Sequence, residues 1–149
     1  MGFFVVEPEV SGRPVGSAAS GAGPACRFDT WLGDDVVRAH PLLLVTTPLK
    51  DALLGLDQPT GFSVVRAEAT RSEFFLCHDP DRQLPELWSV EMQGRPGVDD
   101  LGMGRDGSIV ASARVVEAMG RFSLKHTTLR QHTASRLEQG QTDPASIPA

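Results

Sequence analysis

The sequence predicts a single α+β domain, in which a mixed or mostly antiparallel sheet carries two strand–helix–strand units and their helices pack on the sheet. The chain has 149 residues, 40% of them hydrophobic and 22% charged, which suits one hydrophobic core better than two. An apolar run, a helix-capping residue and a helix-periodic segment follow one another twice, at 42–56 and 108–122. We expect the domain to span residues 1–131 and residues 132–149 to form a polar, disordered tail.

The segment before the first unit predicts extended structure and turns. Residues 3–10 are rich in β-branched and aromatic side chains and predict a strand, which Pro8 ends or places at a sheet edge. Residues 11–25 are rich in Gly, Ser, Ala and Pro, so we expect a flexible loop. A turn follows at 33–35, and His40, which precedes a proline, predicts a break in regular structure.

The first unit begins with residues 42–45, a continuous apolar run of strand length. Thr46 or Thr47 can cap a helix whose first position is Pro48, where a missing N–H costs nothing. Residues 62–69 predict the strand that follows the helix. The expected apolar face of the helix consists of Leu49, Ala52, Leu53 and Leu56.

The segment between the units predicts a short helical turn, a strand and a loop. The helical turn is expected at 72–75, and residues 94–107 predict a long Gly-rich loop. Residues 87–93 alternate in polarity and predict a half-buried strand. Its expected apolar face consists of Trp88, Val90 and Met92.

The second unit repeats the pattern of the first. Residues 108–111 predict a strand, Ser112 a helix cap, and residues 122–130 a further strand. An offset of 65 residues places Asp34-Asp35 on Asp99-Asp100, while the apolar helix positions align at an offset of 66. Few residues are identical, so the sequence leaves open whether the two halves share an ancestor. The expected apolar helix face consists of Val115, Ala118, Met119 and Phe122.

Charge and composition narrow the classes of partner. The formal net charge is −5, and no cluster of Lys and Arg stands out, which disfavours nucleic-acid binding. An acidic chain favours a basic protein partner, because complementary charge speeds association. Cys26 and Cys77 do not make a disulfide framework, and whether they pair stays open. Neither a signal peptide nor an apolar stretch of about 18 residues is visible, so we expect a cytoplasmic protein without a membrane span.

The two Asp-Asp pairs, Asp34-Asp35 and Asp99-Asp100, allow three interpretations. They can accept turn N–H groups beside neighbouring glycines, as aspartates in tight turns often do. They can form an acidic patch that faces a partner. They can also ligate a divalent metal or supply acid–base catalysis, which would require carboxylates from both halves to converge.

The other reactive side chains lack the spacing of a known site. Cys77 and His78 are sequence neighbours, and such neighbours rarely reach the geometry of a nucleophile and its base. Residues 102–107 are Gly-rich but fit no phosphate-binding motif and precede an expected strand. Trp31 lies in an acidic, turn-rich stretch, where an exposed ring can anchor an interface. We expect no metal and no cofactor.

Several segments together resemble a family of small, mostly uncharacterised proteins of actinomycetes. They include "FDTWLGDD", "PLLLVTTPLKDALLGLDQPTGF" and "LPELWSVEMQGRPGVDDLG", and the resemblance covers roughly residues 2–132. That family is similar to immunity proteins of bacterial polymorphic-toxin systems. The helix starts "TTP" and "SAR" depart from the family's usual Ser-Glu-Arg. No catalytic residues come with the resemblance.

These observations lead to one expected function and two alternatives. We expect a non-enzymatic, protein-binding module of the immunity type, which neutralises a toxin by direct binding. Its expected partner contacts are Trp31, Asp34, Asp35, Asp99 and Asp100. The alternatives are a small metal-dependent hydrolase that uses the Asp pairs and a scaffold subunit of a larger assembly.

Overall fold

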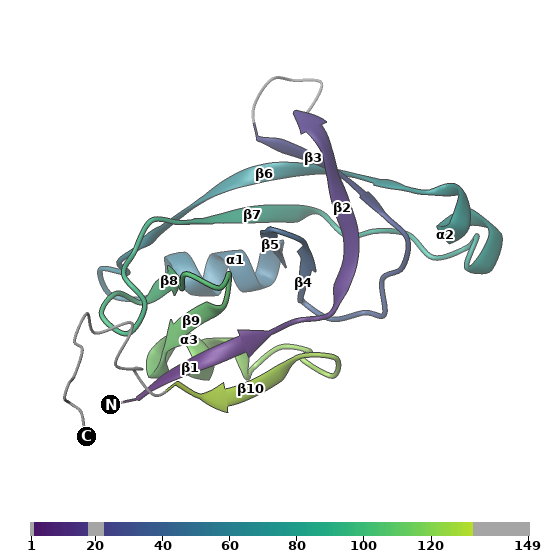
Figure 1. The fold of residues 1–149 in the computed structure, drawn as a ribbon. Coiled ribbons are helices and arrows are strands. Elements are labelled where there is room, and N and C mark those ends of the chain that lie inside the picture. Colours follow the sequence, from purple (N-terminus) through teal and green to yellow (C-terminus); the bar gives the residue numbers. More distant parts are fainter. Residues whose placement is uncertain (1, 18–22, 133–149) are drawn as a thin grey trace.

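The strands of the protein divide between a closed barrel and an open sheet (Figure 1). This computed structural model describes residues 2–17 and 23–132, which contain ten strands and three helices. The predicted α+β class and single domain are confirmed, although the sequence pattern predicts one sheet and the structure has two. In order around the barrel, its strands are β2 (Val10–Ser17), β3 (Pro24–Phe28), β6 (Phe62–Arg71), β7 (Leu87–Met92), β5 (Leu42–Thr46) and β4 (Val36–Ala39).

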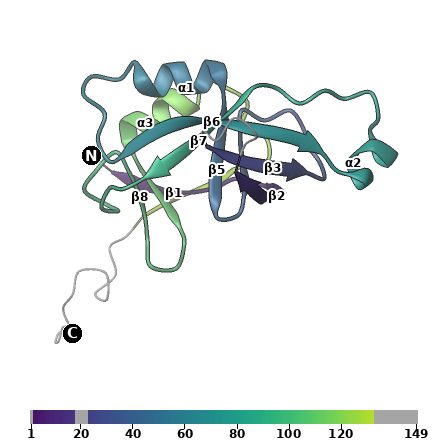
Figure 2. The ribbon, with the colours of Figure 1, turned by 90° about the horizontal axis from the view of Figure 1, so that it is seen from above.

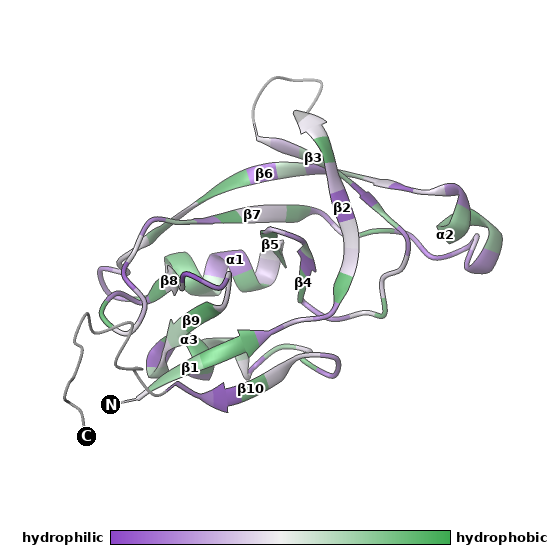
Figure 3. Ribbon diagram, viewed as in Figure 1, coloured by the Kyte–Doolittle hydropathy of each residue, from purple (hydrophilic) through white to green (hydrophobic). Residues whose placement is uncertain are grey.

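The open sheet is antiparallel throughout and has four strands. Figure 3 shows its apolar central strand β1 in green beside the hydrophilic end of the edge strand β10 in purple. No helix among the described residues is long and apolar enough to cross a bilayer. In order, the open sheet consists of β10 (Thr128–Gln131), β1 (Phe3–Glu7), β9 (Ile109–Ser112) and β8 (Leu101–Met103). The helices are α1 (Thr47–Leu54), α2 (Glu73–His78) and α3 (Ala113–Met119).

The flexible loop predicted at 11–25 is wrong for the residues that the structure describes. Strands β2 and β3 occupy most of this segment and pair antiparallel with each other. Gly12 shows why a glycine-rich composition does not indicate a loop here. A Cβ at this position would collide with the carbonyl oxygen of Arg27, so glycine is needed for the close approach of β2 and β3. Residues 18–22 lie outside the described residues, as does the predicted tail beyond His132.

Three other element predictions need correction. The loop predicted at 94–107 contains the short strand β8, and β4 was not predicted at all. The last strand begins at Thr128, whereas the prediction was 122–130. The reason lies in Ser123, Lys125 and His126, whose amides donate to aspartate carboxylates and are therefore not available for a strand ladder.

The two units have the same strand arrangement. In the first, the β4–β5 hairpin leads through α1 to β6, and the antiparallel strand β7 lies between β5 and β6. In the second, the β8–β9 hairpin leads through α3 to β10, and β1 lies between β9 and β10. The predicted repeat is therefore present in the order and direction of the strands. The two units differ in where the central strand comes from, because β7 follows its unit in the chain and β1 precedes its unit.

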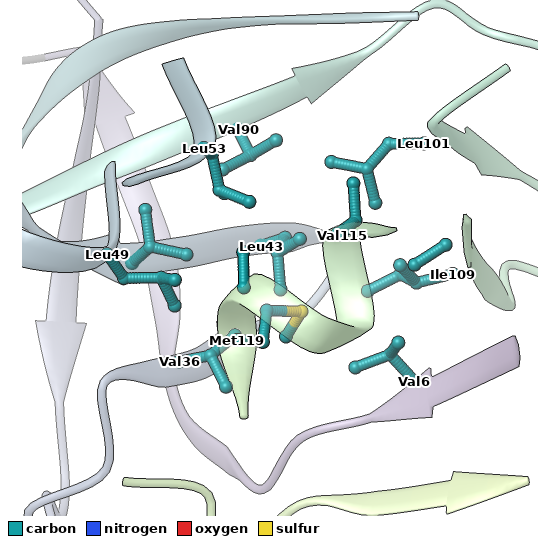
Figure 4. Close-up of a cluster of buried hydrophobic side chains, with 13 residues drawn as sticks. Val6, Val36, Leu43, Leu49, Leu53, Val90, Leu101, Ile109, Val115 and Met119 are labelled. Carbon is teal, nitrogen blue, oxygen red and sulfur yellow. The ribbon is translucent and has the colours of Figure 1, made fainter. Parts of the chain in front are cut away.

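One apolar core fills the space between the two units. Helices α1 and α3 contact each other and lie side by side on one side of the barrel (Figure 2). Figure 4 shows side chains from β1, β5, α1 and α3 converging in this core. The buried members are Val6, Val36, Leu43, Val45, Leu49, Leu53, Val90, Leu101, Ile109, Ala111, Val115, Ala118 and Met119.

A second core fills the barrel interior. Along β5, Leu43 and Val45 face the first core while Leu44 lies in the second, so both faces of the strand are buried. This explains the uninterrupted apolar run in the sequence, because a strand buried on both faces does not alternate. The buried members of the second core are Cys26, Phe28, Val37, Ala39, Leu44, Ala67, Phe75 and Leu87.

Gly61 marks a tight crossing between the units. Its φ is +88°, and a Cβ there would collide with the carbonyl oxygen of Leu101 and lie 2.7 Å from the Cβ of Asp99. An L side chain is therefore excluded both by backbone conformation and by space.

Replacing Gly61 with alanine should consequently destabilise the fold. We expect Gly61→Ala to lower the free energy of unfolding by about 2 kcal/mol or more, measured by urea denaturation. The matched control is Gly120→Ala, because Gly120 has helical backbone angles and its Cβ would make only ordinary contacts at 3.5 Å. A Gly61→Ala variant as stable as the Gly120→Ala variant would contradict this account.

Candidate functional site

Asp35 joins the start of one helix to the segment after the other. The Thr46 hydroxyl, just before α1, donates to Asp35 Oδ1 at 2.6 Å. The Ser123 amide, after α3, donates to Asp35 Oδ2 at 2.9 Å. The Asp35 amide in turn donates to the Ser123 carbonyl at 3.0 Å. We call this set of contacts, made by Asp35, Thr46 and Ser123, the Asp35 clamp.

Asp100 makes the corresponding contacts with the roles of the two units exchanged: it binds the start of α3 and the segment after α1. The Ser112 hydroxyl, just before α3, donates to Asp100 Oδ1 at 2.7 Å. The Thr60 amide, after α1, donates to Asp100 Oδ2 at 2.9 Å. These three residues form the Asp100 clamp. Each unit thus supplies a carboxylate that binds its own helix start and the post-helix segment of the other unit.

Arg114 strengthens the second clamp. Its Nε donates to Asp100 Oδ1 at 2.9 Å and its Nη2 to Oδ2 at 2.8 Å, a bidentate pair. These bonds hold the pKa of Asp100 well below its usual range; burial acts against them, and bonds from Ser112 and Thr60 act with them. The first unit has Pro48 where Arg114 lies, 66 residues earlier, so the Asp35 clamp has no such guanidinium.

Asp34 is fully buried, and its carboxylate accepts hydrogen bonds from the segment after α3. Its side chain is 0% exposed. Its carboxylate accepts from the amides of Lys125 at 3.1 Å and His126 at 2.7 Å, and from the Ser123 hydroxyl at 3.2 Å. Its carbonyl accepts from Trp31 Nε1 at 2.8 Å. Trp31 therefore packs beside this buried aspartate and holds the turn that presents it.

Asp99 closes a local turn. Its Oδ2 accepts from the Arg95 amide at 2.7 Å, and its own amide donates to the Arg95 carbonyl at 3.0 Å. This is the role that the turn interpretation gives to an aspartate near glycines.

The positions predicted as partner contacts are thus engaged inside the fold. Asp34 and Asp100 are 0% and 7% exposed, so their carboxylates leave no free surface for a partner. This corrects the predicted role of these two residues. Trp31, Asp35 and Asp99 are half-buried, and for them partner contact stays a prediction. Sequence reasoning did not identify Thr60 and Ser123, because their partners lie in the other unit.

The helix starts also differ between the units. Ser112 caps α3 as predicted, because its side chain accepts from the Val115 amide at 3.3 Å. Thr46 occupies the cap position of α1 but makes no side-chain cap bond, since its hydroxyl donates to Asp35. The threonine after it, Thr47, donates its hydroxyl to Glu86 at 2.6 Å. Of the two predicted cap candidates, Thr46 does occupy the cap position, but the side-chain hydrogen bond expected of a cap is absent.

The candidate metal ligands do not gather in the part of the chain that the structure describes. Within those residues, no group of three or more His, Cys, Asp or Glu side chains could hold a metal ion. Cys26 is buried, which raises the pKa of its thiol, while Cys77 is exposed, and both thiols are free.

Helix α2 carries two exposed apolar side chains near one end of the barrel. Phe74 is 52% exposed and Leu76 43%, and Leu32 in the β3–β4 connection is 49% exposed. Phe74 and Leu76 line the same groove, and we call these two residues the α2 surface. Figure 1 shows α2 at the end of the barrel remote from the N-terminus. In the β3–β4 connection, the Trp31 ring centroid lies 5.8 Å from the guanidinium carbon of Arg82, which belongs to the α2–β7 connection.

The helix that presents this surface is firmly attached. Phe75 is 1% exposed and belongs to the barrel core. Ser72 caps the helix by accepting from the Phe75 amide at 3.2 Å, and its own amide donates to the Phe28 carbonyl at 2.9 Å. The run Phe74-Phe75-Leu76 is the sequence signal for the surface, because three consecutive apolar residues cannot all face one side of a helix.

The Asp100 clamp predicts how stability depends on pH. Because the folded-state pKa of Asp100 is lowered, its contribution is present in full above about pH 4, the ordinary Asp range, and is lost progressively as the pH falls from there through the lowered pKa. We expect Asp100→Asn to lower the free energy of unfolding by about 2 kcal/mol at pH 7, and by much less at pH 2. Urea unfolding across this pH range measures the difference.

The control is Asp81→Asn, which changes an exposed aspartate in the α2–β7 connection. It should leave stability within about 0.5 kcal/mol of the wild type at each pH. A constant difference between Asp100→Asn and the wild type from pH 7 to pH 2 would contradict the assigned role.

Comparison with known proteins does not assign the chain to a family. No protein-family model matches the chain, and no curated protein or solved structure matches it. The resemblance to immunity proteins therefore rests on the sequence segments alone and stays a prediction. Function has to be argued from the surface that the fold presents.

Proposed function

We propose that the protein is a non-enzymatic protein-binding module, most concretely an immunity-type protein that neutralises a bacterial toxin by direct binding. The observation that carries this proposal is the α2 surface, where Phe74 and Leu76 are displayed on a helix whose neighbour Phe75 is buried. Exposed apolar side chains grouped on one surface are typical of protein–protein contact. The resemblance of the sequence to immunity proteins supports the same class.

The attachment of α2 favours tight binding. Ser72 and Phe75 hold the helix against the barrel before any partner arrives. A preorganised surface loses less conformational entropy on association than a mobile one, so more of its contact energy appears as affinity. The barrel serves in this proposal as a rigid scaffold for the surface.

The expected basic partner remains part of the proposal. The net charge of −5 belongs to the whole chain and acts over distance, so it can accelerate the approach of a basic domain. The buried Asp34 and Asp100 have no place in the contact itself. Trp31 stays in the proposal as an anchor, because its side chain is only half-buried and it precedes the exposed Leu32 in the β3–β4 connection.

Co-expression with the products of neighbouring genes tests the proposal. We expect one product to be toxic when produced alone, and this chain to bind it and restore growth. If none of the products is toxic and none forms a complex with the chain, the immunity function is wrong.

Substitutions on the α2 surface locate the contact. We expect Phe74→Ser and Leu76→Ser each to weaken the complex by about 2 kcal/mol, because exposed anchors at the centre of an interface carry most of its energy. Calorimetric titration with the captured partner measures the loss. The matched control is Leu54→Ser, which removes a leucine of α1 that is 46% exposed. Wild-type affinity in both α2 variants would contradict this placement.

A further inference from the structure

A groove of about 410 Å³ lies beside α2 and combines cationic and apolar walls. Arg13 of β2 and Arg27 of β3 form one side, and Phe74 and Leu76 of α2 form part of the lining. Arg71, at the end of β6, also lines it. The remaining lining residues are Asp29, Ser72 and Glu73.

Two of the arginines lie directly opposite each other. Arg13 and Arg27 are register partners in the antiparallel β2–β3 pair. Like charges in this position repel and destabilise a sheet. Arg27 lies between Cys26 and Phe28, which point into the barrel core, so its side chain points outward and contributes nothing to that core. The contact between these two like charges therefore adds no attraction to the β2–β3 pair.

The charges in the groove are not fully balanced. Asp29 pairs with Arg13 at 3.0 Å, and its pKa is lowered by the Ser72 hydroxyl and by Arg13, so it stays ionised. Arg71 Nη1 donates to the carbonyls of Pro80 and Arg82 at 3.0 Å each, which neutralises none of its charge.

Arg27 is the arginine of the groove whose guanidinium has no partner among the described residues. No described residue forms a hydrogen bond or ion pair with its guanidinium. Glu73 is the one lining carboxylate outside the Arg13–Asp29 pair, and it is exposed in the first turn of α2. The groove thus offers guanidinium groups without a full set of carboxylate partners.

We propose that this groove binds a short acidic segment on the surface of the partner protein, a local feature of a partner that is basic over the rest of its surface. A carboxylate of the segment pairs with Arg27 and Arg13, and an adjacent apolar side chain packs on Phe74 and Leu76. Guanidinium groups bind carboxylates through charge-assisted hydrogen bonds, and the apolar wall selects a peptide over a small anion. The proposal rests on the proposed protein-binding function and names the chemistry of the segment that is bound.

A synthetic peptide tests the groove without the natural partner. The probe is the acetylated, amidated pentapeptide Glu-Asp-Phe-Glu-Asp, titrated into the full chain at low salt and followed by NMR. We expect saturable binding that weakens with added salt. The same peptide with lysines in place of its acidic residues should not bind, and inorganic phosphate should compete only weakly.

Two substitutions should act in opposite directions. Arg27→Gln should weaken peptide binding about tenfold or more, because it removes a charge-assisted bond. Glu73→Gln should strengthen it, because it removes the like charge nearest the peptide. Arg105→Gln, in the β8–β9 connection, is the control and should leave the affinity unchanged. Arg27→Gln should not lower the midpoint of thermal unfolding, so a loss of binding cannot come from misfolding.

Each contrary result is decisive. Absence of saturable binding, or equal binding by the wild type and Arg27→Gln, overturns the assignment of the groove. Phosphate that displaces the peptide at equal concentration shows a small-anion site and also overturns it. If the peptide fails while a toxin still binds through the α2 surface, the groove chemistry is wrong and the proposed function stands.

Discussion

Two aspartate carboxylates hold the halves of this protein together, each reaching from its own unit to the other. Asp35 binds Thr46 and Ser123, and Asp100 binds Ser112 and Thr60. Because each carboxylate accepts from a helix-start hydroxyl and a distant backbone amide, it fixes two segments at once. A carboxylate that is half-buried, as in Asp35, or buried, as in Asp100, requires hydrogen-bond donors, and here hydroxyl and amide groups supply them. The apolar core between α1 and α3 depends on this alignment.

The repeat also shows which parts of the chain lie outside it. In the second unit, the place of β7 is taken by β1, which comes from the start of the chain, so no segment corresponds to α2. Strands β2 and β3, which close the barrel, have no counterpart either. The groove beside α2 is built mainly from β2, β3 and α2, together with Arg71 at the end of β6. In the proposed function, the repeated units are the scaffold, and the proposed binding surfaces lie mainly on the additions that break the repeat.

Local pattern predicted β5, α1, β6, β9 and α3, because burial of both strand faces and of helix faces leaves a plain apolar signature, but it missed the hairpin strands β4 and β8. The prediction failed where long-range contacts decide. Residues 11–25 read as a loop, yet barrel closure pairs most of them in strands. The Asp pairs were visible, but their binding partners Thr60 and Ser123 lie 40 and 88 residues away. No local signal specifies such a partner, so an internal contact resembled an exposed acidic patch.

Native-state hydrogen exchange on the wild type and Asp35→Ala tests the clamps most directly. If the carboxylates unite the domain, removing the Asp35 side chain should lower the protection of amides in the barrel and in strands β1 and β9 by a similar free energy. The two units would then still open as one body, from a less stable state. If only the amides around Thr46 and Ser123 lose protection while β1 and β9 keep wild-type values, the clamp is local and the account is wrong.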